Sequence, residues 1–246
     1  MRYYAVISDI HGNLPALRVV AEYLRRHGIR RVLVLGDIVG YGAFPAQCIR
    51  AVRELPGASV IQGNHDRVAA GDEDPYLRQE ARQVIEWTRQ VLGEEELRFL
   101  EELPAAGIAD SLFFTVHGSL YHPDEYIINS RIARANLELL SERFATVKVA
   151  FFGHTHVPVV ISADGVLQGF RSGQSLELET RKAYLINPGA VGQPRDGNPA
   201  ASFAIFDVYQ WAVTFVRLEY PVEEAQRAIR EAGLPARLAE RLAYGL

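Results

Sequence analysis

Polar clusters that follow apolar segments constrain the possible folds of this chain of 246 residues more than any other feature. There are five of them, each rich in Asp, Asn or His, and nearly every one comes directly after an apolar run that has the length of a buried strand. The clusters are Asp9-Ile10-His11, Gly36-Asp37, Gly63-Asn64-His65-Asp66, Val116-His117-Gly118 and Gly153-His154-Thr155-His156. In parallel α/β sheets, ligands bind at the carboxyl ends of the strands. We therefore expect these side chains to meet at one edge of a sheet.

The order of the apolar segments predicts an α/β fold with parallel strands in its first part. The predicted strands there are 3–8, 31–35, 58–62, 112–116 and 147–152, and the predicted helices are 14–27, 46–53, 74–103 (two helices divided near Gly93) and 132–140. In the last third, strand-like runs at 157–162, 166–170, 183–186, 202–206 and 212–218 predict a mostly antiparallel second sheet, with a hairpin turn at Asp164-Gly165. Helical patterns over 222–232 and 236–243 close the chain.

Length and composition predict one folded domain over residues 1–246. Hydrophobic residues make up 48% and charged residues 23%, as in an average globular protein, and no apolar run is long enough to span a membrane. The N-terminus lacks the pattern of a secretory signal, so we expect a cytoplasmic protein. A net charge of −4 gives no general reason to bind nucleic acid. The single cysteine, Cys48, excludes an intramolecular disulfide and is expected in the core.

The clusters contain the donor set of a metal site with two ions. Residues i and i+2 of an extended chain point the same way, so Asp9 can face the same centre as His11, and His154 the same centre as His156. The candidate ligands are two carboxylates, one amide oxygen and four imidazoles, from Asp9, His11, Asp37, Asn64, His117, His154 and His156. That number exceeds the need of one tetrahedral ion but suits two ions that share a carboxylate. Mixed oxygen and imidazole ligands without thiolate favour manganese, iron or zinc over calcium.

Taken singly, some of these residues have simpler explanations. Asp37 after Gly36 could be a turn residue, and His117 could be a histidine of the core. Five such coincidences at strand ends favour the metal site instead. Ser119 and His122, in contrast, are expected to be ordinary loop residues.

Together and in this order, the motifs D-x-H, G-D, G-N-H-D, a later His, and G-H-x-H resemble those of the calcineurin-like metallophosphoesterase superfamily. A loop over 187–192 resembles one of its small bacterial and archaeal phosphodiesterases. The resemblance implies a four-layer αββα sandwich with two mixed sheets flanked by helices. It also implies two sets of metal ligands: Asp9, His11, Asp37 and His156 for one ion, and Asp37, Asn64, His117 and His154 for the other. Asp37 would bridge the two.

The same resemblance implies a hydrolase that acts on small phosphoesters, as a phosphodiesterase or a phosphatase. Two divalent ions would generate a bridging hydroxide that attacks phosphorus. The expected ion is Mn²⁺, with Fe, Zn, Ni and Co as alternatives. His65 would donate a proton to the leaving oxygen and, with Asn64, contact the substrate, while Asp66 would orient His65. A homo-oligomer is possible, and no membrane partner is expected.

Three other functions stay open at this point. The chain departs from the protein Ser/Thr phosphatases, because Gly40 and Tyr41 stand where the Asp and Arg of their motif G-D-x-x-D-R-G would fall. Arg67 or Arg195 could replace that arginine only if the fold brings one of them near. A noncatalytic metal-binding scaffold of the same fold has no use for His65. A nuclease would be expected to carry a basic arm, and no such arm follows the last motif.

Overall fold

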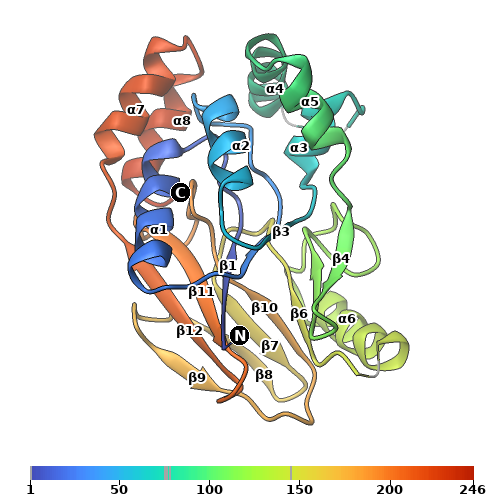
Figure 1. Cartoon of the computed structure of the whole chain (residues 1–246). Helices are drawn as coiled ribbons and strands as arrows, with labels where there is room; N and C mark the ends of the chain where they lie inside the picture. The colour runs from blue at the N-terminus through green and yellow to red at the C-terminus, as the bar shows by residue number, and fades with distance from the viewer. Residues whose placement is uncertain (1, 75–76, 78, 145) are drawn as a thin grey trace.

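Two six-stranded sheets form the centre of the computed structural model, which describes residues 2–74, 77, 79–144 and 146–246 (Figure 1). The first sheet has the order β3-β2-β1-β11-β12-β9 and the second has the order β4-β5-β6-β10-β7-β8. The first comprises β1 (Tyr3–Ile7), β2 (Val32–Val34), β3 (Ala58–Val60), β9 (Ser175–Glu177), β11 (Ala201–Asp207) and β12 (Ala212–Leu218). The second comprises β4 (Ala106–Ala109), β5 (Phe113–Val116), β6 (Val149–Phe151), β7 (Val159–Ser162), β8 (Gly165–Gln168) and β10 (Tyr184–Asn187).

Each sheet contains three neighbouring parallel strands. In the first sheet β2 pairs in parallel with β1 and β3, and in the second β6 pairs in parallel with β5 and β10. The other strand pairs are antiparallel. Each sheet therefore presents the loops after its three parallel strands at one edge.

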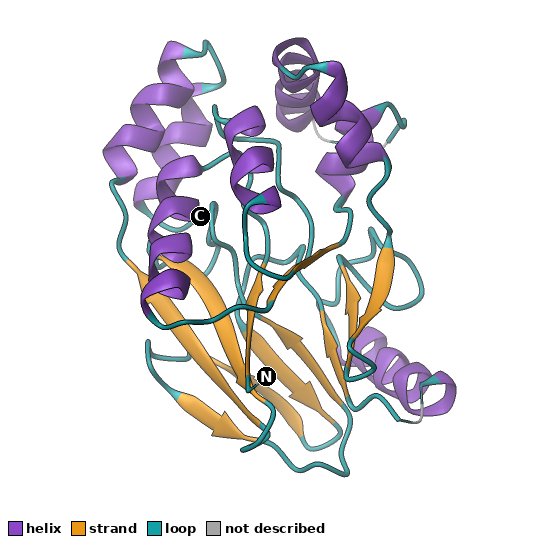
Figure 2. Cartoon of the chain, in the orientation of Figure 1, coloured by secondary structure: helices purple, strands orange, loops and turns teal. Residues whose placement is uncertain are grey.

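The two sheets pack face to face, and helices cover their outer faces (Figure 2). Alternation along β1 sends Val6 into the layer between the sheets, where it joins Phe113 and Phe151 of the second sheet, and sends Ala5 toward the helices. The helices over the first sheet are α1 (Leu14–Arg26), α2 (Pro45–Arg53), α3 (Asn64–Ala70), α4 (Gln79–Val91), α5 (Glu94–Glu101), α7 (Val222–Glu231), α8 (Ala236–Glu240) and the 3₁₀ helix η1 (Arg241–Ala243). The second sheet packs against α6 (Ser130–Arg143).

This architecture confirms the four-layer αββα sandwich. The predicted helix and strand positions agree with the structure to within a few residues, and Cys48 is buried in the core as expected. The long helical stretch divides at Gly93, which caps α5, although residues 75, 76 and 78 of its predicted beginning lie outside the described residues. None of the helices in the described part of the chain combines the length and the hydrophobicity that crossing a bilayer requires.

Two predictions about the fold were wrong, and three elements were missed. The last third does not form its own antiparallel sheet, because β7, β8 and β10 join the second sheet while β9, β11 and β12 join the first. The hairpin turn lies one residue earlier than predicted, at Ala163-Asp164, because Ser162 pairs with Gly165. Helix α3 and the edge strands β4 and β9 were not predicted at all.

Candidate metal centre

The loops after the parallel strands bring all seven predicted ligands to one buried region. Asp9 and His11 follow β1, Asp37 follows β2, and Asn64 begins α3 just after β3. His117 follows β5, and His154 and His156 follow β6. All seven are buried, with exposed fractions of 7% or less. The centre is therefore built from both sheets, with each sheet contributing the carboxyl ends of its parallel strands.

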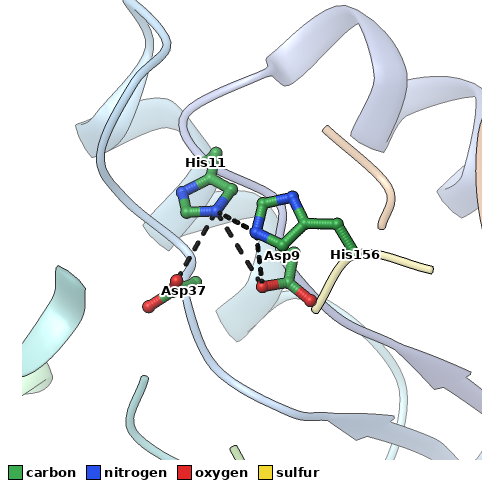
Figure 3. A group of neighbouring side chains, drawn as sticks. All are labelled: Asp9, His11, Asp37 and His156. Atoms are coloured by element: carbon green, nitrogen blue, oxygen red, sulfur yellow. Dashed lines mark hydrogen bonds and ion pairs between the residues drawn. The ribbon is translucent and has the colours of Figure 1, made fainter. Parts of the chain in front are cut away.

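Two groups of potential ligand atoms lie within these seven residues. Asp9, His11, Asp37 and His156 form one group, and Asp37, His117 and His154 form the other, and the ligand atoms of each group lie within 4.8 Å of one another. Figure 3 shows the first group, in which the side chains of all four residues converge on one point. Asp37 belongs to both groups. The geometry agrees with the two predicted ligand sets and with Asp37 between them.

Backbone carbonyls fix the tautomer of each of the four imidazoles. The Nδ1 atoms of His11, His117 and His156 lie 3.2, 2.7 and 2.6 Å from the carbonyl oxygens of Val39, Leu35 and Gln193, and His154 Nε2 lies 3.0 Å from that of Asp124. A carbonyl oxygen only accepts, so each of these nitrogens must carry the proton and donate it. The other nitrogen of each neutral ring then has a free lone pair. Outer hydrogen bonds of this kind are the usual support of metal-bound histidines.

These free lone pairs face one another and face carboxylate oxygens. His11 Nε2 lies 3.2 Å from His156 Nε2, and His117 Nε2 lies 3.1 Å from His154 Nδ1. His156 Nε2 also lies 3.2 Å from Asp9 Oδ1, an oxygen to which no hydrogen bond is donated. Acceptors that converge without a proton between them repel one another in a buried site. A cation between them removes that repulsion, so the residues fit a metal centre.

Asp37 links the two groups, and Asn64 has a buried oxygen in the same region. Asp37 Oδ1 accepts a hydrogen bond from the backbone N–H of His65 at 2.9 Å. Its Oδ2 lies 3.3 Å from His117 Nε2 and 3.5 Å from His11 Nε2, one nitrogen from each group. The Oδ1 atom of Asn64 is buried and accepts no hydrogen bond from the described residues. A buried amide oxygen without a donor is costly, and a cation would compensate for that cost.

The pKa shifts of two histidines, His117 and His154, describe the charge of the site when no metal is bound. Burial favours the neutral ring of His117, yet the charge and hydrogen bond of Asp37 together with the charge of Asp9 outweigh it and raise its pKa to about 10. Burial and the nearby His117 lower the pKa of His154 to about 3. Without a cation, a proton on His117 Nε2 thus takes up the lone pair of that nitrogen and balances part of the charge of the two carboxylates. Metal binding has to displace that proton, so it becomes weaker as the pH falls.

The backbone is strained at the candidate ligands. Nine non-glycine residues in the described part of the chain have a positive φ, and five of them are candidate ligands. These five are Asp9 at 54°, His11 at 48°, Asp37 at 52°, His154 at 65° and His156 at 60°. The left-handed region costs energy for any residue with a Cβ, and it persists only where surrounding contacts impose it. Such strain clusters at functional sites, and here it turns the side chains toward a common centre.

Glycine is required where these loops touch. A Cβ on Gly63 would lie 2.2 Å from Asp37 Oδ1 and 2.3 Å from the Asp37 nitrogen. A Cβ on Gly153 would lie 1.9 Å from Ser8 Oγ. Both distances are shorter than atoms can approach, so the motif glycines allow the close contact of loops from different strands.

We expect Gly63→Ala to lower the affinity for Mn²⁺ about 10- to 100-fold, because the added methyl group displaces Asp37. Isothermal titration of protein stripped of metal with a chelator measures the affinity. Gly107→Ala is the matched control, because its Cβ would meet only ordinary contacts, the nearest being Thr115 Oγ1 at 3.4 Å. A folded Gly63→Ala variant with the affinity of the wild type would contradict this prediction.

His65 differs from the four candidate ligand histidines. Its ring packs against Tyr41 at 4.5 Å and against His11 at 4.9 Å, and its Nδ1 is buried without a hydrogen-bond partner. Burial lowers its pKa, against the charge of Asp37 and with the help of Arg195. The ring thus lies beside the centre without the carbonyl anchor that the ligands have. This position suits a group that approaches the substrate, and its catalytic role stays a prediction.

The expected role of Asp66 differs from the one the structure shows. Its Oδ1 accepts hydrogen bonds from the backbone N–H groups of Ile38 at 2.8 Å and Val39 at 3.0 Å, and its Oδ2 accepts from Gly63 at 3.1 Å. Asp66 therefore holds the loop that carries Asp37 and forms no hydrogen bond with His65 among the described residues. We assign it a structural role in the centre instead of the orientation of His65.

The loop over 187–192 contributes more contacts to the centre than its sequence indicates. Asn187 Nδ2 donates to the carbonyl oxygen of Gly153 at 2.6 Å, and the N–H of Gly192 donates to that of Asp9 at 2.9 Å. This loop therefore joins the Asp9 loop to the His154 loop.

Tyr126 was not predicted as part of the site, although the centre of its ring stacks 3.7 Å from that of His154. Tyr126 lies in a loop with no motif, so no local signal marked it.

The structure also answers which arginine lies near the centre. Arg67 is engaged with Asp124 at 2.5 Å and with Asp72 at 3.3 Å. The backbone N–H of Arg195 donates to the carbonyl oxygen of His156 at 3.3 Å, and its guanidinium carbon lies 5.9 Å from the ring centre of Tyr41. Arg195 is therefore the arginine that the fold brings to the centre.

Comparison with known proteins supports this description. Residues 1–210 match the model of the calcineurin-like phosphoesterase superfamily domain. The chain is 39% identical to the uncharacterized protein MJ0912 of Methanocaldococcus jannaschii, over 98% of this chain and 97% of that protein. It is 26% identical to the phosphodiesterase YfcE of Escherichia coli, over 81% of this chain and 84% of that protein. The crystal structure of a metallophosphoesterase from Sphaerobacter thermophilus is 40% identical and superposes with a TM-score of 0.84, covering 100% of this chain and 99% of the other. The chain therefore belongs to the calcineurin-like phosphoesterase superfamily and is a metal-dependent phosphoesterase.

Proposed function

We propose that this protein is a binuclear metal-dependent hydrolase of small phosphoesters, acting as a phosphodiesterase or phosphatase. One observation carries the proposal: two groups of inward-facing ligand atoms share the carboxylate of Asp37. An open cleft of about 930 Å³ adjoins them and is lined by Asn64, His65 and His154 among others. A cleft of this size accommodates a small substrate beside the metals.

The two groups, with Asn64 added to the second, supply the residues that would hold each ion. Asp9, His11, Asp37 and His156 would hold one ion, and Asp37, Asn64, His117 and His154 the other. Oxygen and imidazole donors without thiolate favour Mn²⁺, with Fe, Zn, Ni and Co as alternatives. When bound, two such ions would supply Lewis-acid chemistry and an activated water for attack on phosphorus.

The protein itself would contribute orientation and proton control. Four backbone carbonyls each accept a hydrogen bond from one nitrogen of a ligand imidazole and aim the other nitrogen inward. Asp66 holds the loop that places Asp37. Asn64 and His65 line the cleft, where Asn64 would contact the bound phosphoryl group and His65 would donate a proton to the leaving oxygen.

Cytoplasmic residence and a homo-oligomeric state also stay predictions.

Hydrolysis after metal removal and reloading tests the proposal. We expect chelator-treated protein to hydrolyse bis-p-nitrophenyl phosphate or p-nitrophenyl phosphate at least about a hundredfold more slowly than the same protein reloaded with Mn²⁺, because Lewis-acid stabilisation amounts to several kcal/mol. Release of p-nitrophenolate measures the rate. The proposal also requires two anomalous peaks, one in each ligand group, in crystals soaked with Mn²⁺. Reloaded protein without turnover of either ester, or with no metal between Asp9, Asp37 and His154, would refute it.

A further inference from the structure

The cleft beside the metal centre contains two arginines that the metal chemistry does not use. Arg195 and Arg241 both line it, together with Tyr41, His65 and Tyr126. Within the described residues, no Asp or Glu side chain forms an ion pair with either guanidinium, and Arg241 contacts an oxygen of Leu246. Two positive side chains without Asp or Glu partners beside a phosphoesterase centre are suited to bind an anion.

Arg195 is held in place but has free hydrogen-bonding capacity. Its Nη2 donates to Gln193 Oε1 at 2.9 Å, which fixes the side chain to the loop whose carbonyl supports His156. Its Nε is buried and has no hydrogen-bond partner. A buried N–H of a charged group without an acceptor is costly, and an anionic ligand would provide that acceptor.

Arg241 comes from a different part of the chain. It begins η1, in the C-terminal segment that lies beyond residues 1–210 matched by the superfamily domain. Its Nε donates to an oxygen of Leu246, and this contact orients the side chain. Burial and the positive charge of Arg195 lower the pKa of Arg241 to about 10, which leaves it charged at neutral pH. The C-terminal helices thus add a second cation to the cleft.

Three of the four acidic residues that line the cleft, which are Asp74, Glu80, Asp124 and Glu125, have identified partners other than the two arginines. Glu80 lies 3.8 Å from Arg237, Asp124 lies 2.5 Å from Arg67, and Glu125 accepts a hydrogen bond from Ser119 at 2.5 Å. Glu80 also attracts Arg241 weakly at longer range. These pairs leave the two arginines as the cations available to a ligand on this side of the cleft.

The position of Arg195 relative to the centre indicates which part of a substrate it meets. Tyr41 is a shared neighbour, because its ring packs on His11 at 4.6 Å and on His65 at 4.5 Å, and the Arg195 guanidinium carbon lies 5.9 Å from the centre of the same ring. The guanidinium therefore belongs to the wall of the cleft next to the groups that would act on the scissile phosphate. A substrate whose reacting phosphate is at the metals can thus reach Arg195 with a second group.

On the basis of the proposed function, we propose that Arg195 and Arg241 form a subsite for a second phosphate group, so that the preferred substrates are phosphoesters with more than one phosphate. Planar guanidinium groups bind phosphate through paired hydrogen bonds, and two of them can share its charge. The two residues of this subsite come from distant parts of the chain. It also gives the C-terminal helices a role in substrate selection.

AMP and ADP, which differ by one phosphate, test the subsite as competitive inhibitors of bis-p-nitrophenyl phosphate hydrolysis at fixed free Mn²⁺. We expect the wild type to bind ADP at least about tenfold more tightly than AMP. A hydrogen bond between charged groups contributes enough binding free energy to lower Kd by about that factor or more. Arg195→Ala and Arg241→Ala should each reduce this ratio to about threefold or less, and Arg241→Lys should restore part of it. Arg230→Ala removes an exposed arginine from α7 and is the matched control, which should keep the wild-type ratio.

The possible outcomes separate this inference from the proposed function. A wild type that hydrolyses the ester but binds ADP and AMP equally would overturn the subsite alone, as would alanine variants that keep the wild-type ratio. Protein that hydrolyses no phosphoester would refute the proposed function. In that case isothermal titration of the metal-loaded protein with ADP and AMP still tests the subsite, and equal affinities would overturn it. Melting temperatures close to that of the wild type show that the variants are folded.

Discussion

Replacing Asp37 with asparagine is expected to lower kcat/KM for bis-p-nitrophenyl phosphate at least about a thousandfold, because several kcal/mol of metal stabilisation depend on it. Asp37 Oδ2 faces His117 at 3.3 Å and His11 at 3.5 Å, so this oxygen serves both ligand groups. An amide in its place carries no charge and offers only one oxygen. Because Asp37 Oδ1 also accepts the N–H of His65, the amide oxygen is expected to take that bond and leave the NH₂ group facing the metals.

Metal content gives this prediction a second measurement. By mass spectrometry we expect about two ions per wild-type chain and fewer than one in Asp37→Asn. Asp110→Asn is the matched control, since Asp110 is an exposed aspartate that also has a positive φ, of 49°. It should keep both the metal content and the rate. An Asp37→Asn protein that retains a tenth or more of the wild-type rate would show that Asp37 is not the bridge.

The helices and interior strands could be predicted from the sequence because their apolar periodicity is local. Alternation along β1 and β2 and helical spacing along α1 reflect which face each residue buries. The sheet to which a strand belongs is decided by its partner, which no local pattern encodes. β10 was therefore recognised as a strand and assigned wrongly, since it pairs in parallel with β6 from the middle of the chain. The edge strands β4 and β9 are short and largely exposed, so they have no strong pattern to detect.

The candidate site also has features that could be predicted from the sequence and features that could not. The ligands could be predicted because each follows a strand whose end the sequence marks. The relation between His65 and Asp66 could not, although they are adjacent. Both lie in the first turn of α3, where consecutive residues point in different directions, so Asp66 faces the loop of Ile38 and Val39 while His65 faces Tyr41. Arg241 lies 46 residues after Arg195 in the sequence, and only the packing of the C-terminal helices brings them to one cleft.

His65→Ala is expected to keep both metal ions and to lose rate mainly on substrates with poor leaving groups. A proton donor matters most when the departing oxygen is a strong base, and general acid catalysis contributes about 10²- to 10⁴-fold. His65 lies beside the candidate ligands without the carbonyl anchor that each of them has, so its removal should leave the donor set intact. Its backbone N–H, which donates to Asp37 at 2.9 Å, is retained in the alanine variant.

A pair of esters that differ only in the leaving group isolates this effect. We expect hydrolysis of ethyl phenylphosphonate to fall about 10²- to 10⁴-fold and that of p-nitrophenyl phenylphosphonate at most about tenfold, with phenylphosphonate release measured for both. His122→Ala is the matched control, because this exposed histidine lines the same cleft from a loop, and it should keep the ratio of the two rates. Equal losses on both esters would instead mean that His65 positions the substrate or supports Asp37. Its ring, packed against Tyr41 and His11, would then act through shape and not through its proton.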